Sequence, residues 1–324
     1  MTRRVLLLAT KDTIAHRHGS IATGAELLAT IPADRLAADV AVEDVLAEPG
    51  WDMSPGTMLA LARRARAAIA EDGFDGVVLT HGIDTLEETA YLADLLAGPA
   101  AARGAIVLTG ATRSLDELSS DGPRNLAAAI AAAADPALAG AGAVACLNDE
   151  LHAARWVTLA DAAGVAAFSS APHPPLGRVT GGKAGEGVEL LAAPPPRPPD
   201  PHGDPETDIA LIKTYPGIDG ALLTAVVDAG ARGVVLEGTG LCNVPASLLA
   251  AISDLTEWDI PVVVASRCRT RPVALDALPL GTGMAGQVGA IGARDLAPAK
   301  ARAALMVALG GGGVAAARDY FDRL

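Results

Sequence analysis

Hydroxyl and carboxyl side chains follow three apolar runs of this sequence. Residues 10–15 read TKDTIA, residues 80–89 read THGIDTLEET, and residues 109–113 read TGATR, which runs on to SSDGPRN at 119–125. A threonine or serine hydroxyl is a poor nucleophile until a neighbouring base takes its proton. These segments therefore contain the residue types that nucleophilic or acid–base chemistry needs.

The apolar runs of the chain have the length of buried strands and alternate with helical stretches. The expected strands are residues 5–8, 76–79, 105–108, 142–147, 209–212, 233–236 and 261–265, and the expected helices are 57–70, 86–96, 125–134 and 221–229. This alternation predicts an α/β protein with a doubly wound parallel sheet. Because ligands bind beyond the carboxyl ends of such strands, the three polar clusters should line one pocket.

Each cluster also has a purely structural interpretation as a loop with a helix cap. Asp84 or Thr85 would cap a helix that starts at Leu86, and Asp121 would start the helix that follows Pro123. Both interpretations stay open for any single cluster. Three such clusters at consecutive strand ends favour a pocket.

Composition limits the classes of function. The net charge is −13, with 38 acidic against 25 basic residues and no run of Lys or Arg, which argues against nucleic-acid binding. The three cysteines, Cys146, Cys242 and Cys268, are far apart and form no CxxC pair, so neither a disulfide framework nor a metal site is indicated. Nothing in the sequence indicates a cofactor.

Length and linker composition predict two domains. The proline-rich stretch at 193–207 should be an extended linker between an N-terminal domain at 1–192 and a smaller C-terminal domain at 208–324. The apolar run at 5–9 is too short for a signal-peptide core or a membrane span, so we expect a cytoplasmic protein that does not bind membranes.

Several segments resemble bacterial L-asparaginases. THGIDTLEETAYL at 80–92 resembles their THGTDTLEETA motif, and LTGATRSLDELSSDGPRNLAAA at 108–129 resembles their TGAMRP…SxDGPxNLxxA segment. TKDTIA at 10–15 stands where the family has TGGTIA, LNDELHAARWVT at 147–158 is similar to NDxIxxAxxVTK, and ARDLAPAKARAAL at 293–305 resembles the C-terminal helix of the family. The matches keep the family's order over nearly the whole chain.

The resemblance implies a fold, a chemistry and an assembly. The fold would be a large N-terminal domain with a mixed sheet and a small parallel C-terminal domain. The chemistry would be acyl transfer from a small-molecule amide to a threonine. Backbone amides would stabilise the oxyanion, and a second threonine, an Asp and a Lys would manage protons. The chain would assemble as a homodimer or homotetramer with its sites at subunit boundaries.

Carried over residue by residue, the resemblance is partial. The nucleophilic threonine corresponds to Thr13 and the family Asp to Asp84, and both are present. The second threonine falls on Ile83 and the lysine on Leu159, which cannot transfer protons. The substrate-binding serine falls on Gly50.

Other positions complete the set of site residues that the resemblance implies. Lys11 and Asp12 replace the two glycines before Thr13, and Lys11 is a candidate catalytic residue as charge partner of Asp84 or base to Thr13. A solvated loop lysine is the competing interpretation. The remaining candidates for substrate binding are Asp12, Ile83, Leu159, Gly50, Trp51, Asp52, Thr109, Gly110 and Asn243.

Three interpretations follow from these departures. The chain is a plain asparaginase that has been misaligned, a catalytically silent homologue that binds a small molecule, or an enzyme with a remodelled site. The matching flanks of Ile83 argue against misalignment. The paired loss of threonine and lysine favours remodelling. We therefore expect an amidohydrolase that acts on a small amino-acid-derived amide or imide and hydrolyses L-asparagine weakly or not at all.

Overall fold

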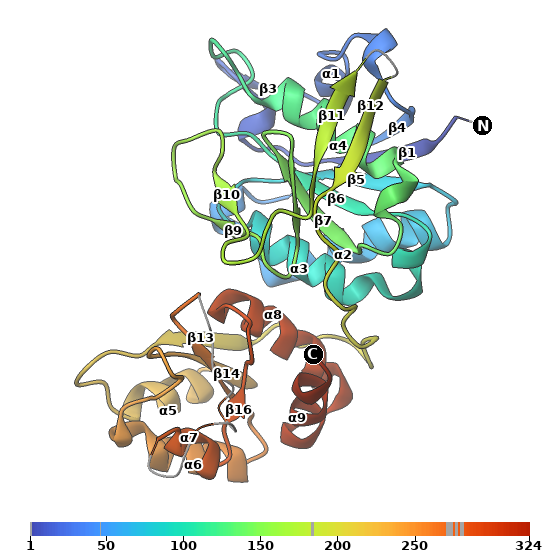
Figure 1. Cartoon of the computed structure of the whole chain (residues 1–324). Coiled ribbons are helices and arrows are strands. Elements are labelled where there is room, and N and C mark those ends of the chain that lie inside the picture. The colour runs from blue at the N-terminus through green and yellow to red at the C-terminus, as the bar shows by residue number, and fades with distance from the viewer. Residues whose placement is uncertain (1, 46, 183–184, 270–274, 276–277, 279–281) are drawn as a thin grey trace. The chain divides into compact units, whose positions relative to one another are not determined.

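Two units of α/β structure make up the chain in the computed structural model, Met1–Arg197 and Pro198–Leu324 (Figure 1). The structure describes residues 2–45, 47–182, 185–269, 275, 278 and 282–324. Each unit has its own sheet and its own buried core.

The sheet of the N-terminal unit has eight strands in the order β12-β11-β8-β7-β6-β5-β1-β4. Strands β4, β1, β5, β6 and β7 run parallel to one another, whereas β8, β11 and β12 are each antiparallel to the preceding neighbour. The strands span Arg4–Ala9 (β1), Asp39–Asp44 (β4), Gly76–Thr80 (β5), Ile106–Thr109 (β6), Ala143–Leu147 (β7), Glu150–Ala153 (β8), Gly177–Gly182 (β11) and Gly185–Leu190 (β12).

Helices cover both faces of this sheet. Helices α1 and α4 share one buried cluster with β1, β5, β6 and β7, while α2 and α3 pack against each other and on the strands from the other side (Figure 1). The helices span Gly24–Leu28 (α1), Pro55–Ala70 (α2), Leu86–Ala97 (α3) and Gly122–Ala134 (α4). Two short ribbons pair His16–Arg17 (β2) with Ser20–Ile21 (β3) and Thr158–Leu159 (β9) with Phe168–Ser169 (β10).

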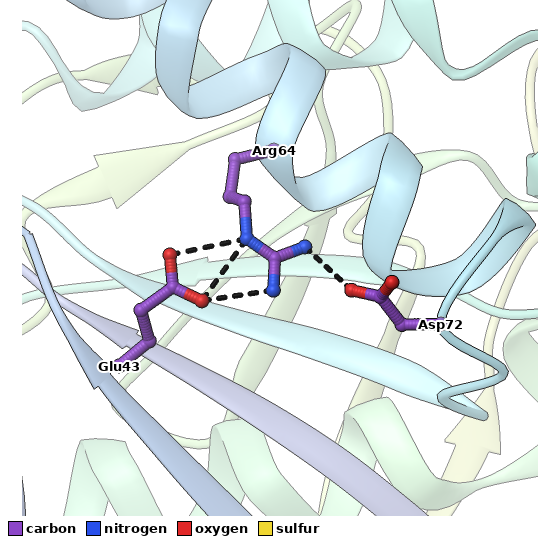
Figure 2. A network of polar contacts seen from close by, with 3 residues as sticks. All are labelled: Glu43, Arg64 and Asp72. Atoms are coloured by element: carbon purple, nitrogen blue, oxygen red, sulfur yellow. Dashed lines mark hydrogen bonds and ion pairs between the residues drawn. The ribbon is translucent and has the colours of Figure 1, made fainter.

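Local sequence features explain where helix α2 begins and how it is held against the sheet. Ser54 caps its first turn by accepting a hydrogen bond from the Thr57 amide at 3.1 Å, and Pro55 occupies the first helical position. Figure 2 shows how the helix is tied to the edge strand: Arg64 donates to both oxygens of Glu43 and, at 2.9 Å, to Asp72. The three side chains are partly exposed, so this network orients α2 more than it stabilises the fold.

The C-terminal unit contains a parallel sheet of four strands in the order β13-β14-β15-β16. Its valine-rich central strands are buried on both faces, as expected for a parallel sheet between helices. The elements span Ile209–Lys213 (β13), Ala221–Asp228 (α5), Gly233–Gly238 (β14), Leu249–Glu257 (α6), Val262–Ser266 (β15), Met284–Gln287 (α7), Ile291–Gly292 (β16), Pro298–Ala308 (α8) and Val314–Arg323 (α9).

The predicted fold class is confirmed: a larger doubly wound N-terminal domain is followed by a smaller domain with a parallel sheet. Across the described part of the chain, no helix combines the length and the apolar character that crossing a membrane would need.

Candidate active site

The chain reverses its direction of travel across the N-terminal sheet at β1. Strand β4 lies on one side of β1 and β5 on the other, so a topological switch point lies between β1 and β5. Ligands of open α/β sheets bind at such points, beyond the carboxyl ends of the strands. The loops after β1 and β5 hold the first two polar clusters of the sequence.

Two buried threonines join the ends of these strands. The Thr10 amide donates to Thr80 Oγ1 at 2.8 Å, and the Thr10 hydroxyl donates to the Thr80 carbonyl at 2.6 Å. Neither side chain is more than 2% exposed, so these hydroxyls serve the framework and do not face a ligand. The bonds fix the positions from which both loops leave the sheet.

Asp12 and Thr13 follow at the mouth of the switch point. Asp12 Oδ1 accepts hydrogen bonds from the Thr13 amide at 2.7 Å and from the Thr13 hydroxyl at 3.3 Å. Asp12 Oδ2 accepts a 2.6 Å bond from the amide of Gly50, which lies 38 positions further along the chain. The structure therefore brings together Asp12, Thr13 and Gly50, all of which the sequence marks as site residues.

Gly50 and Gly82 are in close backbone contact beside Asp12. A Cβ atom built on Gly50 would lie 2.7 Å from Gly82 Cα, and one built on Gly82 would lie 2.3 Å from Asp12 Oδ2. The Thr85 hydroxyl holds the Gly50 carbonyl with a 2.6 Å hydrogen bond. A serine at position 50, as the resemblance expects, would collide with the Gly82 backbone in this arrangement.

The charged candidates lie at the surface. Lys11 and Asp84 are both exposed, and within the described residues neither takes part in an ion pair. The expected Lys11–Asp84 partnership is therefore not formed in this structure. The cause is local, because Asp84 has solvent around it and does not need the cation that a buried carboxylate would require.

The apolar candidates occupy separate elements. Ile83 is half-buried, and its Cγ2 would lie 3.2 Å from a Cβ on Gly110, so it lies beside the end of β6. Leu159 is half-buried on the β9–β10 ribbon, opposite Phe168. Trp51 is 72% exposed, and Asp52 is exposed beside it.

Two further candidates already have partners of their own. Thr109 is fully buried, and its hydroxyl donates to the Cys146 carbonyl at 2.7 Å, so it serves the packing of the sheet. Asn243 lies in the C-terminal unit, where its side-chain oxygen accepts a 2.8 Å bond from the Gly283 amide.

The side-chain caps expected at the starts of α3 and α4 are not formed. Thr85 and Asp121 stand directly before α3 and α4, but neither side chain caps its helix. Thr85 holds Gly50, and the two Asp121 oxygens accept bonds at 3.0 Å from the amides of Thr112 and Arg113. These residues brace the loops of the site, a role that depends on contacts far along the chain.

His81 is buried beneath the same loop. Its Nδ1 donates to the Gly82 carbonyl at 2.8 Å, because a carbonyl can only accept, and its Nε2 then accepts from the Thr89 hydroxyl at 2.8 Å. Burial lowers the pKa of His81, and the Gly82 contact offsets this only in part. The histidine is a neutral structural residue that positions Gly82.

This burial predicts a pH dependence of stability. The folded-state pKa of His81 lies below its unfolded value, so below about pH 6.5 the unfolded chain binds one more proton at this residue. As the pH falls below this value, we expect the protonation of His81 in the unfolded chain to reduce the free energy of unfolding by up to about 1.4 kcal/mol per pH unit. Urea unfolding at several pH values should show a shallower slope for His81→Asn. A slope as steep in His81→Asn as in the wild type would contradict this expectation.

The site has the residue types of acid–base chemistry and no evident metal centre. No group of three or more His, Cys, Asp or Glu side chains in the described residues is arranged to hold a metal ion. The half-buried Thr13 hydroxyl, the Asp12 carboxylate that accepts its hydrogen bond and the backbone amide of Gly50 meet at the switch point. This is an α/β protein whose candidate site lies beyond its parallel strands.

Comparison with known proteins identifies the family. The family described as "Asparaginase, N-terminal" matches residues 4–190, and the "Glutaminase/Asparaginase C-terminal domain" matches residues 208–321. The chain belongs to the asparaginase family. Its relatives are hydrolases that act on carbon–nitrogen bonds.

Individual relatives match most of the chain. A probable L-asparaginase of Deinococcus radiodurans is 37% identical over 243 residues, which cover 73% of this chain and 71% of the relative. L-asparaginase 2 of Escherichia coli is 32% identical over 325 residues, covering 94% of this chain and 88% of the relative. The crystal structure of a probable cytoplasmic L-asparaginase from Campylobacter jejuni superimposes with a TM-score of 0.85 at 28% identity, covering 99% of this chain and 100% of that one.

Proposed function

We propose that this protein hydrolyses a small amino-acid-derived amide or imide, with Thr13 as the nucleophile. The observation that carries the proposal is the hydrogen bond from the Thr13 hydroxyl to Asp12 Oδ1, 3.3 Å long, at the switch point of the sheet. A hydroxyl with a carboxylate acceptor at such a switch point has both parts of an activated nucleophile. Membership of a family of amide hydrolases makes amides the first substrates to test.

The proposed reaction uses these groups in two steps. The Thr13 oxygen attacks the amide carbon while its proton passes to Asp12, and the carbon–nitrogen bond then breaks as the nitrogen takes up that proton. The resulting ester is hydrolysed by water, which returns the proton to Thr13. Asp84 and Lys11, at the exposed rim, are proposed to contact the polar end of the substrate, and Ile83 its apolar part.

The test is product release from a panel of amides, imides and lactams. Thr13→Val, which removes only the hydroxyl, should abolish release, whereas Thr13→Ser should retain part of it because serine keeps the nucleophilic oxygen. Thermal unfolding of both variants controls for folding. If Thr13→Val is as active as the wild type, Thr13 is not the nucleophile. If panel members bind to the wild type without any release, the chain is instead a silent binding homologue.

A second proposal concerns assembly and location. Family members are commonly oligomeric, and we propose a homodimer or homotetramer in the cytoplasm for this chain. Isologous pairing is the usual way in which such assemblies close. Light scattering at micromolar concentration should therefore report two or four copies, and a monomer would contradict the assembly.

A further inference from the structure

A pocket of about 360 Å³ lies in the C-terminal unit, at the amino ends of its parallel strands. Three of its lining residues closely precede strands: Glu206 comes before β13, Arg232 before β14 and Ile260 before β15. The other lining residues are Trp258, Asp259, Leu309, Gly312 and Gly313. Small-molecule sites usually have a volume of about 300–1,000 Å³, so this pocket has the size of one. The candidate active site is built from the N-terminal unit, so the two are separate features.

Two carboxylates of the pocket are held in place by backbone amides. Glu206 Oε1 accepts hydrogen bonds from the amides of Thr207 at 2.8 Å and Asp208 at 3.1 Å. Asp259 Oδ1 accepts a 2.8 Å bond from the amide of Val314, the first residue of α9. Among the described residues, no group donates to the second oxygen of either carboxylate. Each side chain therefore presents one acceptor that the protein itself does not use.

Arg232 adds a positive charge to the same pocket. Its amide donates to the Asp208 carbonyl at 2.7 Å, which fixes the backbone from which the side chain extends. Its guanidinium makes no hydrogen bond or ion pair with any described residue, although Glu206 and Asp259 line the pocket with it. Charges of both signs thus face one cavity without neutralising each other in an ion pair.

Apolar side chains and glycines form the rest of the lining. Trp258 is 61% exposed, and Ile260 and Leu309 are half-buried. An indole ring offers a flat apolar face against which a side chain of a ligand can pack. Gly312 adopts φ +125°, which favours glycine, so the turn before α9 leaves this part of the pocket open.

We infer that this pocket binds a free α-amino acid with an apolar side chain, in its zwitterionic form. Arg232 pairs with the α-carboxylate through its planar set of donors, and the unused oxygens of Glu206 and Asp259 accept bonds from the α-ammonium. The side chain of the ligand packs on Trp258. A simple anion would face two carboxylates and a simple cation would face the guanidinium, so a ligand with both charges fits best. The inference goes beyond the proposed function, because it involves neither Thr13 nor a covalent step.

Equilibrium dialysis of the full chain with three related probes tests the need for both charges. L-Phenylalanine carries both, phenylpropionate lacks the ammonium and phenylethylamine lacks the carboxylate. L-Phenylalanine should bind with a Kd on the order of 1 mM or tighter, as a ligand of about a dozen non-hydrogen atoms can. Each of the other two probes should bind at least about tenfold more weakly, because it loses one set of charge-assisted bonds.

Variants of the charged residues assign the binding to this pocket. Arg232→Gln, and separately Glu206→Gln combined with Asp259→Asn, should each weaken L-phenylalanine binding at least about tenfold. Both should fold normally: Arg232 has no side-chain bond to lose, and the amide side chains keep the oxygens that accept from the backbone. Asparagine also tolerates the φ of 61° at position 259. Arg323→Gln neutralises another exposed arginine of the same unit and should bind like the wild type. Thermal unfolding without ligand checks the fold of each variant.

Three results would overturn the inference. The first is no binding of L-phenylalanine to the wild type at about 10 mM, roughly ten times the expected Kd. The second is binding of phenylpropionate or phenylethylamine as tight as that of L-phenylalanine, which would indicate a site for a simple anion or cation. The third is L-phenylalanine binding that survives unchanged in either pocket variant, which would place the ligand elsewhere on the chain. None of these results depends on amide turnover.

Discussion

L-Asparagine should be hydrolysed by this chain at least about a thousand-fold more slowly than by a typical asparaginase. In the proposed alignment, Ile83 and Leu159 stand where the family has a threonine and a lysine that transfer protons. Losing one positioned acid–base group commonly costs about 10²–10⁴-fold. The assay is ammonia release from L-asparagine under saturating conditions.

Restoring the two polar residues is the matched control. Ile83→Thr with Leu159→Lys should raise asparagine hydrolysis but leave it below the family level, because the serine position remains Gly50. Gly50→Ser should not help further, since a Cβ there would lie 2.7 Å from Gly82 Cα. Wild-type turnover of asparagine at roughly tens per second, ordinary for an enzyme, would show that the interpretation of Ile83 and Leu159 is wrong.

The strands of the fold that are apolar throughout could be predicted from the sequence. The runs at 5–8, 76–79 and 142–147 became β1, β5 and β7 within one or two residues at each end. The edge strand β4 was not predicted, because its sequence DVAVED holds only three apolar residues between acidic ones, a shorter apolar run than those of the central strands. A parallel strand buried on both faces has a strong hydrophobic signal, and an edge strand does not.

The strand ends that carry the candidate site could be predicted, but the contacts among its residues could not. Polar residues after β1 and β5 indicate a crevice because the topology of parallel sheets places strand ends together. The bond between Asp12 and Gly50 spans 38 positions, and that between Thr85 and Gly50 spans 35, so no local pattern reveals them. Local reasoning instead predicted a helix cap at Asp84 or Thr85 and a role for Lys11 as the charge partner of Asp84.

The same limit applies to Arg197, which lies in the proline-rich segment that the sequence predicts to be an extended linker. In the structure its guanidinium pairs with Oδ1 of Asp94 on α3 and donates to the Asp94 carbonyl at 2.7 Å. The Ala143 amide donates to the same carboxylate at 2.8 Å. The pair therefore anchors the end of the N-terminal unit to α3 and β7.

Replacing Arg197 with alanine should lower the free energy of unfolding by about 3–5 kcal/mol at neutral pH, the usual cost of leaving a buried charge without its partner. The side chain of Asp94 is 5% exposed, and burial raises its pKa although Arg197 lowers it. A folded pKa above the unfolded value means that stability is greatest at low pH and falls as pH rises through the folded pKa. Without Arg197 the pKa of Asp94 rises further. The free energy of unfolding that is lost on replacing Arg197 should therefore be smaller at acidic pH than at neutral pH.

Chemical unfolding at several pH values measures this effect against two controls. Arg178→Ala breaks an exposed pair with Glu189, in which the side chains are 56% and 48% exposed, and should cost no more than about 1 kcal/mol. Asp94→Leu combined with Arg197→Met removes both charges and should recover much of the stability, since the cost comes from the uncompensated carboxylate. If Arg197→Ala costs no more than Arg178→Ala, Arg197 does not compensate the buried charge. An equal loss at all pH values would mean that packing, and not the carboxylate, is responsible.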